Sequence, residues 1–180
     1  MGMDGNGLNG RRLWIAIAVY VGLIYLTLPW MRSVVQFLYV HMGRERLSLY
    51  VNLSVLLALG LMILYLRRIL PRLSKKQFLL GLFFAIAGAW VLLLFAPEER
   101  VHLFEYGLLG FFCLRALGRE TRSPHFKAML IVLVVGIGDE LIQHTLPNRV
   151  GDPRDVALNF MSAVPGVLAQ HLRWEGETQS

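Results

Sequence analysis

Ionisable residues gather at three places in a chain that is otherwise rich in apolar segments. His102 and Glu105 lie near the start of one apolar segment, Asp139 and Glu140 lie near the end of a later one, and a polar loop with Arg149, Asp152 and Asp155 follows. A charged side chain at the centre of a membrane helix costs about 2.5–3.5 kcal/mol on insertion scales. A cluster of such residues therefore predicts a functional site.

The residue types at these places suit proton transfer and anion binding. Two desolvated carboxyl groups close together hold their protons with different affinities, as the acid and the base of a catalytic pair do. We expect Glu140 to act as the base and Glu105 as the acid or as an orienting group, with His102 transferring protons at neutral pH. The guanidinium of Arg149 could bind a phosphate or carboxylate bidentately.

A divalent metal is an alternative use of the same residues. His102 and Glu105, with Glu140 and Asp155, could hold an ion that activates water. The spacing alone does not establish such a site, so the sequence predicts no cofactor. Cys113 is the only cysteine, which excludes a metal site made of cysteines, and we expect it to be a small buried apolar residue.

Composition predicts an all-α membrane protein. Of the 180 residues 56% are hydrophobic and 17% charged, against about 25% charged residues in soluble domains. Apolar runs near the length that crosses a bilayer define about six transmembrane helices in a single domain, residues 1–180, with flexible tails at 1–10 and 173–180. The six segments are Leu13–Trp30, Ser48–Leu66, Gln77–Ala96, Val101–Leu117, Ala128–Leu146 and Asp155–Leu172. Alternatively, five spans accompany an interfacial helix over Met31–Leu47.

The lysines and arginines predict the orientation of these spans. With the N-terminus in the cytoplasm, twelve of the eighteen fall in inner segments and six in outer ones. The positive-inside rule then places both termini of a multi-pass protein in the cytoplasm, in a bacterial inner membrane. The same loops account for the net charge of +6, so this charge does not indicate nucleic-acid binding.

Helical spacing places the polar residues on shared faces. His102 and Glu105 are three residues apart with Tyr106 beside them, Glu140 and Gln143 share a face of the fifth segment, and Asp155 and Asn159 share a face of the sixth. If these faces meet, a polar pocket opens at the outer side of the membrane.

This pattern resembles the VanZ-like family of bacterial membrane proteins. The resemblance covers residues 97–168: His102 and Tyr106 begin one span, Asp139-Glu140 and Gln143 end the next, and Pro147, Arg149, Asp152, Asp155 and Asn159 follow. The family is named for resistance to the antibiotic teicoplanin, which implies a link to the cell envelope and to lipid-linked precursors on its outer face.

Three functions remain open at this point. The first is binding or regulation of an anionic envelope ligand, either lipid-linked or related to a glycopeptide. The second is a membrane-embedded hydrolase or transferase acting through Glu105, Glu140 and His102, and the third is a transporter. The expected partners are the lipid bilayer and that ligand, with a homodimer left open and no nucleic acid. The predicted ligand-binding residues are Arg149, Asp139, Gln143, Tyr106, Asp152, Asp155 and Asn159.

Overall fold

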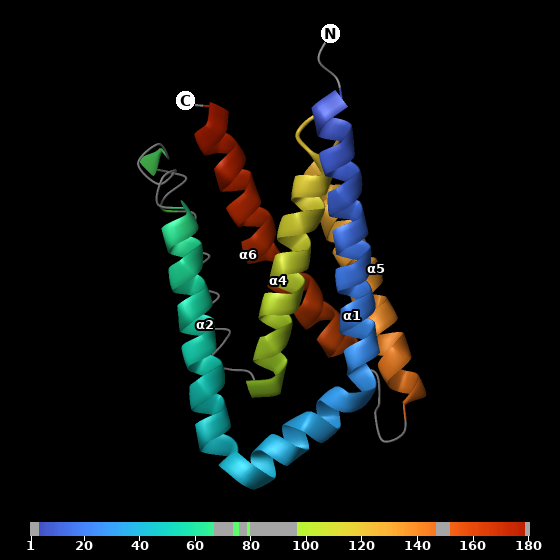
Figure 1. The fold of residues 1–180 in the computed structure, drawn as a ribbon, viewed down its shortest axis with the longest axis vertical. Coiled ribbons are helices and arrows are strands. Elements are labelled where there is room, and N and C mark those ends of the chain that lie inside the picture. The colour runs from blue at the N-terminus through green and yellow to red at the C-terminus, as the bar shows by residue number, and fades with distance from the viewer. Residues whose placement is uncertain (1–3, 67–73, 76–78, 80–96, 147–151, 179–180) are drawn as a thin grey trace.

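The protein is all-helical in the parts that the computed structural model describes, which are residues 4–66, 74–75, 79, 97–146 and 152–178. Five long helices occur there (Figure 1): α1 (Asp4–Met42), α2 (Arg44–Leu66), α4 (Pro97–Leu117), α5 (Pro124–Thr145) and α6 (Pro153–Thr178). Helix α1 thus begins inside the segment expected as an N-terminal tail, and α6 runs on to Thr178 inside the one expected at the C-terminus.

Glycine and proline set the helix boundaries. Gly43, between α1 and α2, has φ +79°, and Gly118, after α4, has φ +72°. A helix commonly ends on a residue in this left-handed conformation, which glycine adopts without a steric penalty. Pro124 and Pro153 open α5 and α6, where a missing N–H costs nothing because the first turn has no acceptor for it.

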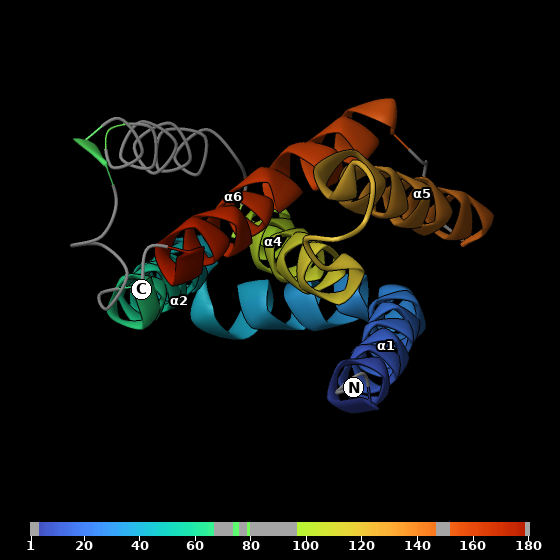
Figure 2. The same cartoon turned by 90° about the horizontal axis from the view of Figure 1, so that it is seen from above.

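Helix α4 packs against α1, α5 and α6, and the hydrophobic core lies between these four helices (Figures 1 and 2). The core combines Tyr106, Leu109 and Cys113 of α4 with residues of the other three helices, namely Ile17, Ala128, Val132, Val135, Ala163 and Val167. Helix α2 is joined to α4 through the buried Arg100, whose Nη1 donates to Ser48 Oγ at 3.2 Å and also bonds Asn52 Oδ1.

Glycines bring α4 and α6 unusually close. A Cβ built on Gly166 of α6 would overlap the main-chain carbonyl of Gly107, and one on Gly110 would lie 2.8 Å from the carbonyl oxygen of Ala163. Backbone atoms cannot move aside as side chains do. The tight α4–α6 contact therefore requires residues without a side chain at these positions, and it brings the polar faces of the two helices together.

Apolar side chains also point outward, in stripes along single helices. On α1 the exposed stripe is Ile15, Val19, Leu23, Leu26 and Trp30, and on α5 it is Phe126, Leu130, Val134, Ile137 and Leu141. The spacing of three and four residues keeps each stripe on one face. The opposite face of α1, with Ile17, Ile24 and Leu28, is buried.

The expected bundle of six membrane spans is wrong. Within the described residues one helix, Gly10–Met42 of α1, is long and apolar enough to cross a membrane, with a mean hydropathy of 1.9 over its best window. The multi-pass localisation, with both termini in the cytoplasm, is wrong for the same reason. The helices α4, α5 and α6 carry buried polar residues, among them Arg100, Asp139 and Gln170, so part of each helix is polar and faces protein.

Two further predicted segments are the interfacial helix and the third span. Residues 31–42 of the predicted interfacial helix belong to α1, which continues through Pro29 and changes direction along its length (Figure 1). A proline inside a helix removes one main-chain hydrogen bond and commonly bends it. The predicted span Gln77–Ala96 lies outside the described residues apart from Leu79.

Candidate functional site

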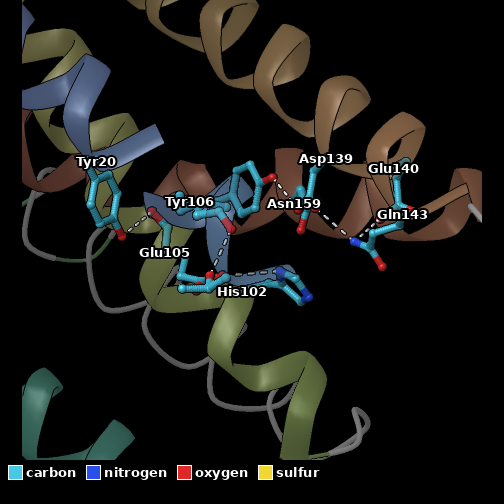
Figure 3. A network of polar contacts seen from close by, with 10 residues as sticks. Tyr20, His102, Glu105, Tyr106, Asp139, Glu140, Gln143 and Asn159 are labelled. Atoms are coloured by element: carbon cyan, nitrogen blue, oxygen red, sulfur yellow. Dashed lines mark hydrogen bonds and ion pairs between the residues drawn. The ribbon is translucent and has the colours of Figure 1, made fainter. Parts of the chain in front are cut away.

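Asp139 is the centre of a buried hydrogen-bond network between α4, α5 and α6 (Figure 3). Its side chain is 0% exposed. Tyr106 Oη donates to Asp139 Oδ2 at 2.7 Å, and Gln143 Nε2 donates to Asp139 Oδ1 at 2.9 Å. Asn159 Nδ2 lies 3.5 Å from Asp139 Oδ2, at the long limit of a hydrogen bond. Donors from three helices thus converge on one carboxylate.

Tyr106 is held as a hydrogen-bond donor by its surroundings. Burial first, and then the neighbouring Asp139 carboxylate, raise the pKa of Tyr106 above its usual value near 10. The hydroxyl therefore keeps its proton at any physiological pH and can only donate to Asp139.

Glu140 extends the network toward the start of α6. Gln143 Nε2 donates to Glu140 Oε1 at 3.3 Å, and the main-chain N–H of Asp152 donates to Glu140 Oε2 at 3.0 Å. Asp152 Oδ1 in turn accepts from the N–H of Arg154 at 2.8 Å, which is the pattern of an N-cap. Glu140 therefore fixes the position at which α6 begins.

His102 and Glu105 form the more accessible part of the site. His102 Nδ1 lies 3.5 Å from Glu105 Oε2, and the two side chains are 23% and 26% exposed. Burial, followed by repulsion from Asp139, raises the pKa of Glu105 from 4.5 to about 7. Near neutral pH this carboxyl group can both give and take a proton.

Two tyrosines of α1 complete the surroundings and were not predicted from the sequence. Tyr20 Oη donates to the main-chain carbonyl of Glu105 at 3.2 Å, and Tyr25 Oη donates to that of Val135 at 2.8 Å. They attach α1 to α4 and to α5 beside the network. Their polar hydroxyls in the middle of an apolar helix were the available signal.

An apolar groove lies between α1 and α4 next to this network. Its volume is about 310 Å³, and it is lined by Leu13, Ala16, Val19, Tyr20, Leu23 and Phe112. Tyr20 belongs both to the groove and to the contact with Glu105. Tyr20 thus links the groove to the main chain of α4 at Glu105.

The structure brings most of the predicted site residues together. His102 pairs with Glu105. Hydrogen bonds connect a second group of predicted residues, which are Tyr106, Asp139, Glu140, Gln143, Asp152 and Asn159. Arg149 lies outside the described residues. Asp155 is half-buried in the first turn of α6 and makes no described bond to Asp139.

The predicted roles of Glu140 as the base and Glu105 as the acid stay predictions. No described hydrogen bond joins Glu105 to Glu140, and the carboxylate that influences Glu105 is Asp139. Among the described residues no set of three or more histidine, cysteine and acidic side chains could hold a metal ion. His102, Glu105, Glu140 and Asp155 thus do not form the metal site considered above.

Comparison with known proteins gives no match for this chain among family models, curated proteins or solved structures. The VanZ-like resemblance therefore rests on residues 97–168 alone.

Proposed function

We propose that the chain is a VanZ-like, membrane-associated protein that binds an envelope lipid, with the polar headgroup at the α4–α5–α6 network. The observation that carries the proposal is the Asp139 network itself, in which a fully buried carboxylate is surrounded by donors from three helices. Well-packed apolar residues often stabilise a helical core as well as buried charges do, or better. A ligand-binding role explains why so many polar groups lie in the core of this protein.

Asn159 supports a ligand with hydrogen-bond donors. Asn159 Oδ1 is buried and has no hydrogen-bond partner within the described part of the chain. Leaving a buried acceptor unsatisfied costs about 1–3 kcal/mol. A hydroxyl or amide group of a ligand would remove that cost.

Charge indicates which part of a ligand belongs here. The described site contains three carboxyl groups, the partly exposed Glu105 and the buried Asp139 and Glu140, and all of them accept hydrogen bonds when ionised. Hydroxyl, amide and ammonium groups suit such a site, whereas a phosphate is repelled by it. For a lipid-linked sugar, the sugar would face the carboxyl groups, and its phosphate would need a cation at the margin. Arg154, at the start of α6, is the candidate within the described part of the chain.

Helix α1 supports contact with lipid. Residues 13–31 carry no charge, Arg12 and Arg32 flank them, and Trp14 and Trp30 lie near the two ends. Twenty residues of helix span about 30 Å, the thickness of the hydrocarbon layer, and tryptophans favour its two boundaries. We assign the outward stripe of α1 to contact with lipid, and the α1–α4 groove, which shares Val19 and Leu23 with that stripe, to the apolar chain of the bound lipid.

The test is equilibrium binding of three lipids to the purified chain in detergent, followed by native mass spectrometry. The lipids are a polyprenyl diphosphate that carries a sugar, the same lipid without the sugar, and phosphatidylglycerol. The sugar-bearing lipid should bind at least tenfold more tightly than the others, and Glu105→Gln should reduce this preference. Equal binding of all three lipids would contradict the proposal.

A second candidate is an enzyme that hydrolyses such a lipid or transfers a group from it. The observation in its favour is Glu105, which is accessible, lies beside His102 and has a pKa of about 7, the range suited to acid–base catalysis. If the chain is an enzyme, Glu105→Gln abolishes product formation from the sugar-bearing lipid while binding persists. If wild type forms no product, the binding function remains.

A further inference from the structure

His125 and His171 form a second cluster that the proposed function does not use. His125 lies in the first turn of α5 and His171 near the end of α6, and the two imidazole nitrogens, His125 Nε2 and His171 Nδ1, are 3.3 Å apart. The ring planes are inclined by 72°. Both rings line a cavity of about 230 Å³ whose other walls are Val164, Val167 and Leu168.

We infer that this pair is a binding site for a divalent transition-metal ion. Two imidazole nitrogens bound to one tetrahedral zinc at about 2.0–2.1 Å are separated by about 3.3 Å, which is the separation seen here. The nitrogens that carry the site belong to two helices, so the ion would join the start of α5 to the end of α6.

The protonation of the pair suits metal binding. In the hydrogen bond between the rings, one nitrogen carries a proton that the other accepts. For an ion to bind both nitrogens, that proton moves to the other nitrogen of its own ring, so both imidazoles bind the metal in the neutral form.

The chemistry of the surroundings limits the kind of ion. Imidazole favours Zn²⁺, Ni²⁺ and Cu²⁺ over Mg²⁺ and Ca²⁺. No third histidine, cysteine or acidic side chain within the described residues completes the site, so water or a ligand from solution would fill the remaining positions. Arg119 lies 5.6 Å over the ring of the neighbouring Trp174 and pairs with Glu177.

Trp174 provides a local reporter. Its ring centroid lies 6.0 Å from that of His125. Because Cu²⁺ quenches nearby indole fluorescence, copper bound to the pair should reduce the emission of Trp174. The chain has three other tryptophans, so Trp174→Phe identifies which part of the quenching comes from this site.

The experiment titrates the full-length, untagged chain in detergent with Zn²⁺ and Cu²⁺ by calorimetry at pH 7.5. We expect one ion per chain, at least tenfold weaker binding in His125→Gln and in His171→Gln, and unchanged binding in the control His144→Ala, which removes another exposed histidine. Trp174→Phe should retain copper binding and lose most of the quenching. Circular dichroism establishes that each variant is folded.

Two results would overturn the inference. One is the absence of stoichiometric binding by the folded wild type. The other is binding that persists unchanged in the double variant His125→Gln, His171→Gln. Because the readout is metal binding alone, failure of the lipid-binding function would leave this test unaffected, and the reverse also holds.

Discussion

Replacing Glu105 by glutamine should remove a pH dependence from the stability of the protein. Burial and the nearby Asp139 raise the pKa of Glu105 from 4.5 to about 7. Between these values the folded state binds more protons than the unfolded state, so the free energy of unfolding falls as the pH rises through this window. Above pH 7 both states are ionised and the decrease ends.

The size of this effect follows from the shift. A shift of about 2.5 pKa units corresponds to about 3 kcal/mol, since each unit is about 1.4 kcal/mol. The Glu105 side chain is 26% exposed, so solvent screening reduces this figure toward about 2 kcal/mol. Wild type should therefore lose about 2–3 kcal/mol relative to Glu105→Gln between pH 4.5 and pH 8.

The assay is denaturant unfolding in detergent, followed by circular dichroism at steps of half a pH unit. Glu120→Gln, which removes an exposed glutamate from the α4–α5 loop, is the matched control for the loss of one carboxyl group. Only the Glu105 variant should change the pH profile. If the difference between wild type and Glu105→Gln were the same at pH 5 and pH 8, the burial of Glu105 and its repulsion by Asp139 would be the wrong description.

Three further predictions follow from the packing. A double-mutant cycle with Tyr106→Phe and Asp139→Asn should give a coupling free energy of about 1.5–3 kcal/mol in unfolding experiments, because the 2.7 Å bond joins a hydroxyl to a charged group. A coupling below about 0.5 kcal/mol would show that this hydrogen bond contributes little. Gly166→Ala should lower the melting temperature clearly, since its Cβ would overlap the Gly107 carbonyl, whereas Gly60→Ala has open space and should not; equal effects would refute the close α4–α6 contact. Leu23→Arg changes the exposed stripe of α1 and should reduce the fraction of the protein that floats with lipid vesicles, since the insertion of an arginine into a membrane helix costs about 2.5–3.5 kcal/mol. An unchanged floating fraction would contradict lipid contact at that stripe.

The sequence predicted most of the polar cluster, and helical spacing explains why. Tyr106 could be assigned to the face of His102, Gln143 to that of Glu140, and Asn159 to that of Asp155, because the members of each pair are three or four positions apart. The central residue could not be assigned in the same way. Asp139 and Glu140 are neighbours that point about 100° apart on the helix, and only the packing of α5 against α4 makes Asp139 the acceptor for Tyr106.

The membrane arrangement was predicted less well, for a physical reason. Hydropathy counts apolar residues without regard to what covers them. In α4, Leu109, Cys113 and Leu114 are buried in the core of the protein, although they contribute to hydropathy as lipid-facing residues do. The contribution of α1 to the site was missed because Tyr20 and Tyr25 bond main-chain carbonyls, and the positions of their hydroxyls in an apolar helix do not identify such partners.

Binding of the sugar-bearing polyprenyl diphosphate to wild type and to Asp139→Asn tests the central claim most directly. The substitution keeps the shape of the side chain and removes the charge on which the donors of α4, α5 and α6 converge. The proposed function predicts at least tenfold weaker binding by a variant that remains folded. Equal affinity of the folded variant and wild type would show that the buried network serves the fold and binds no headgroup.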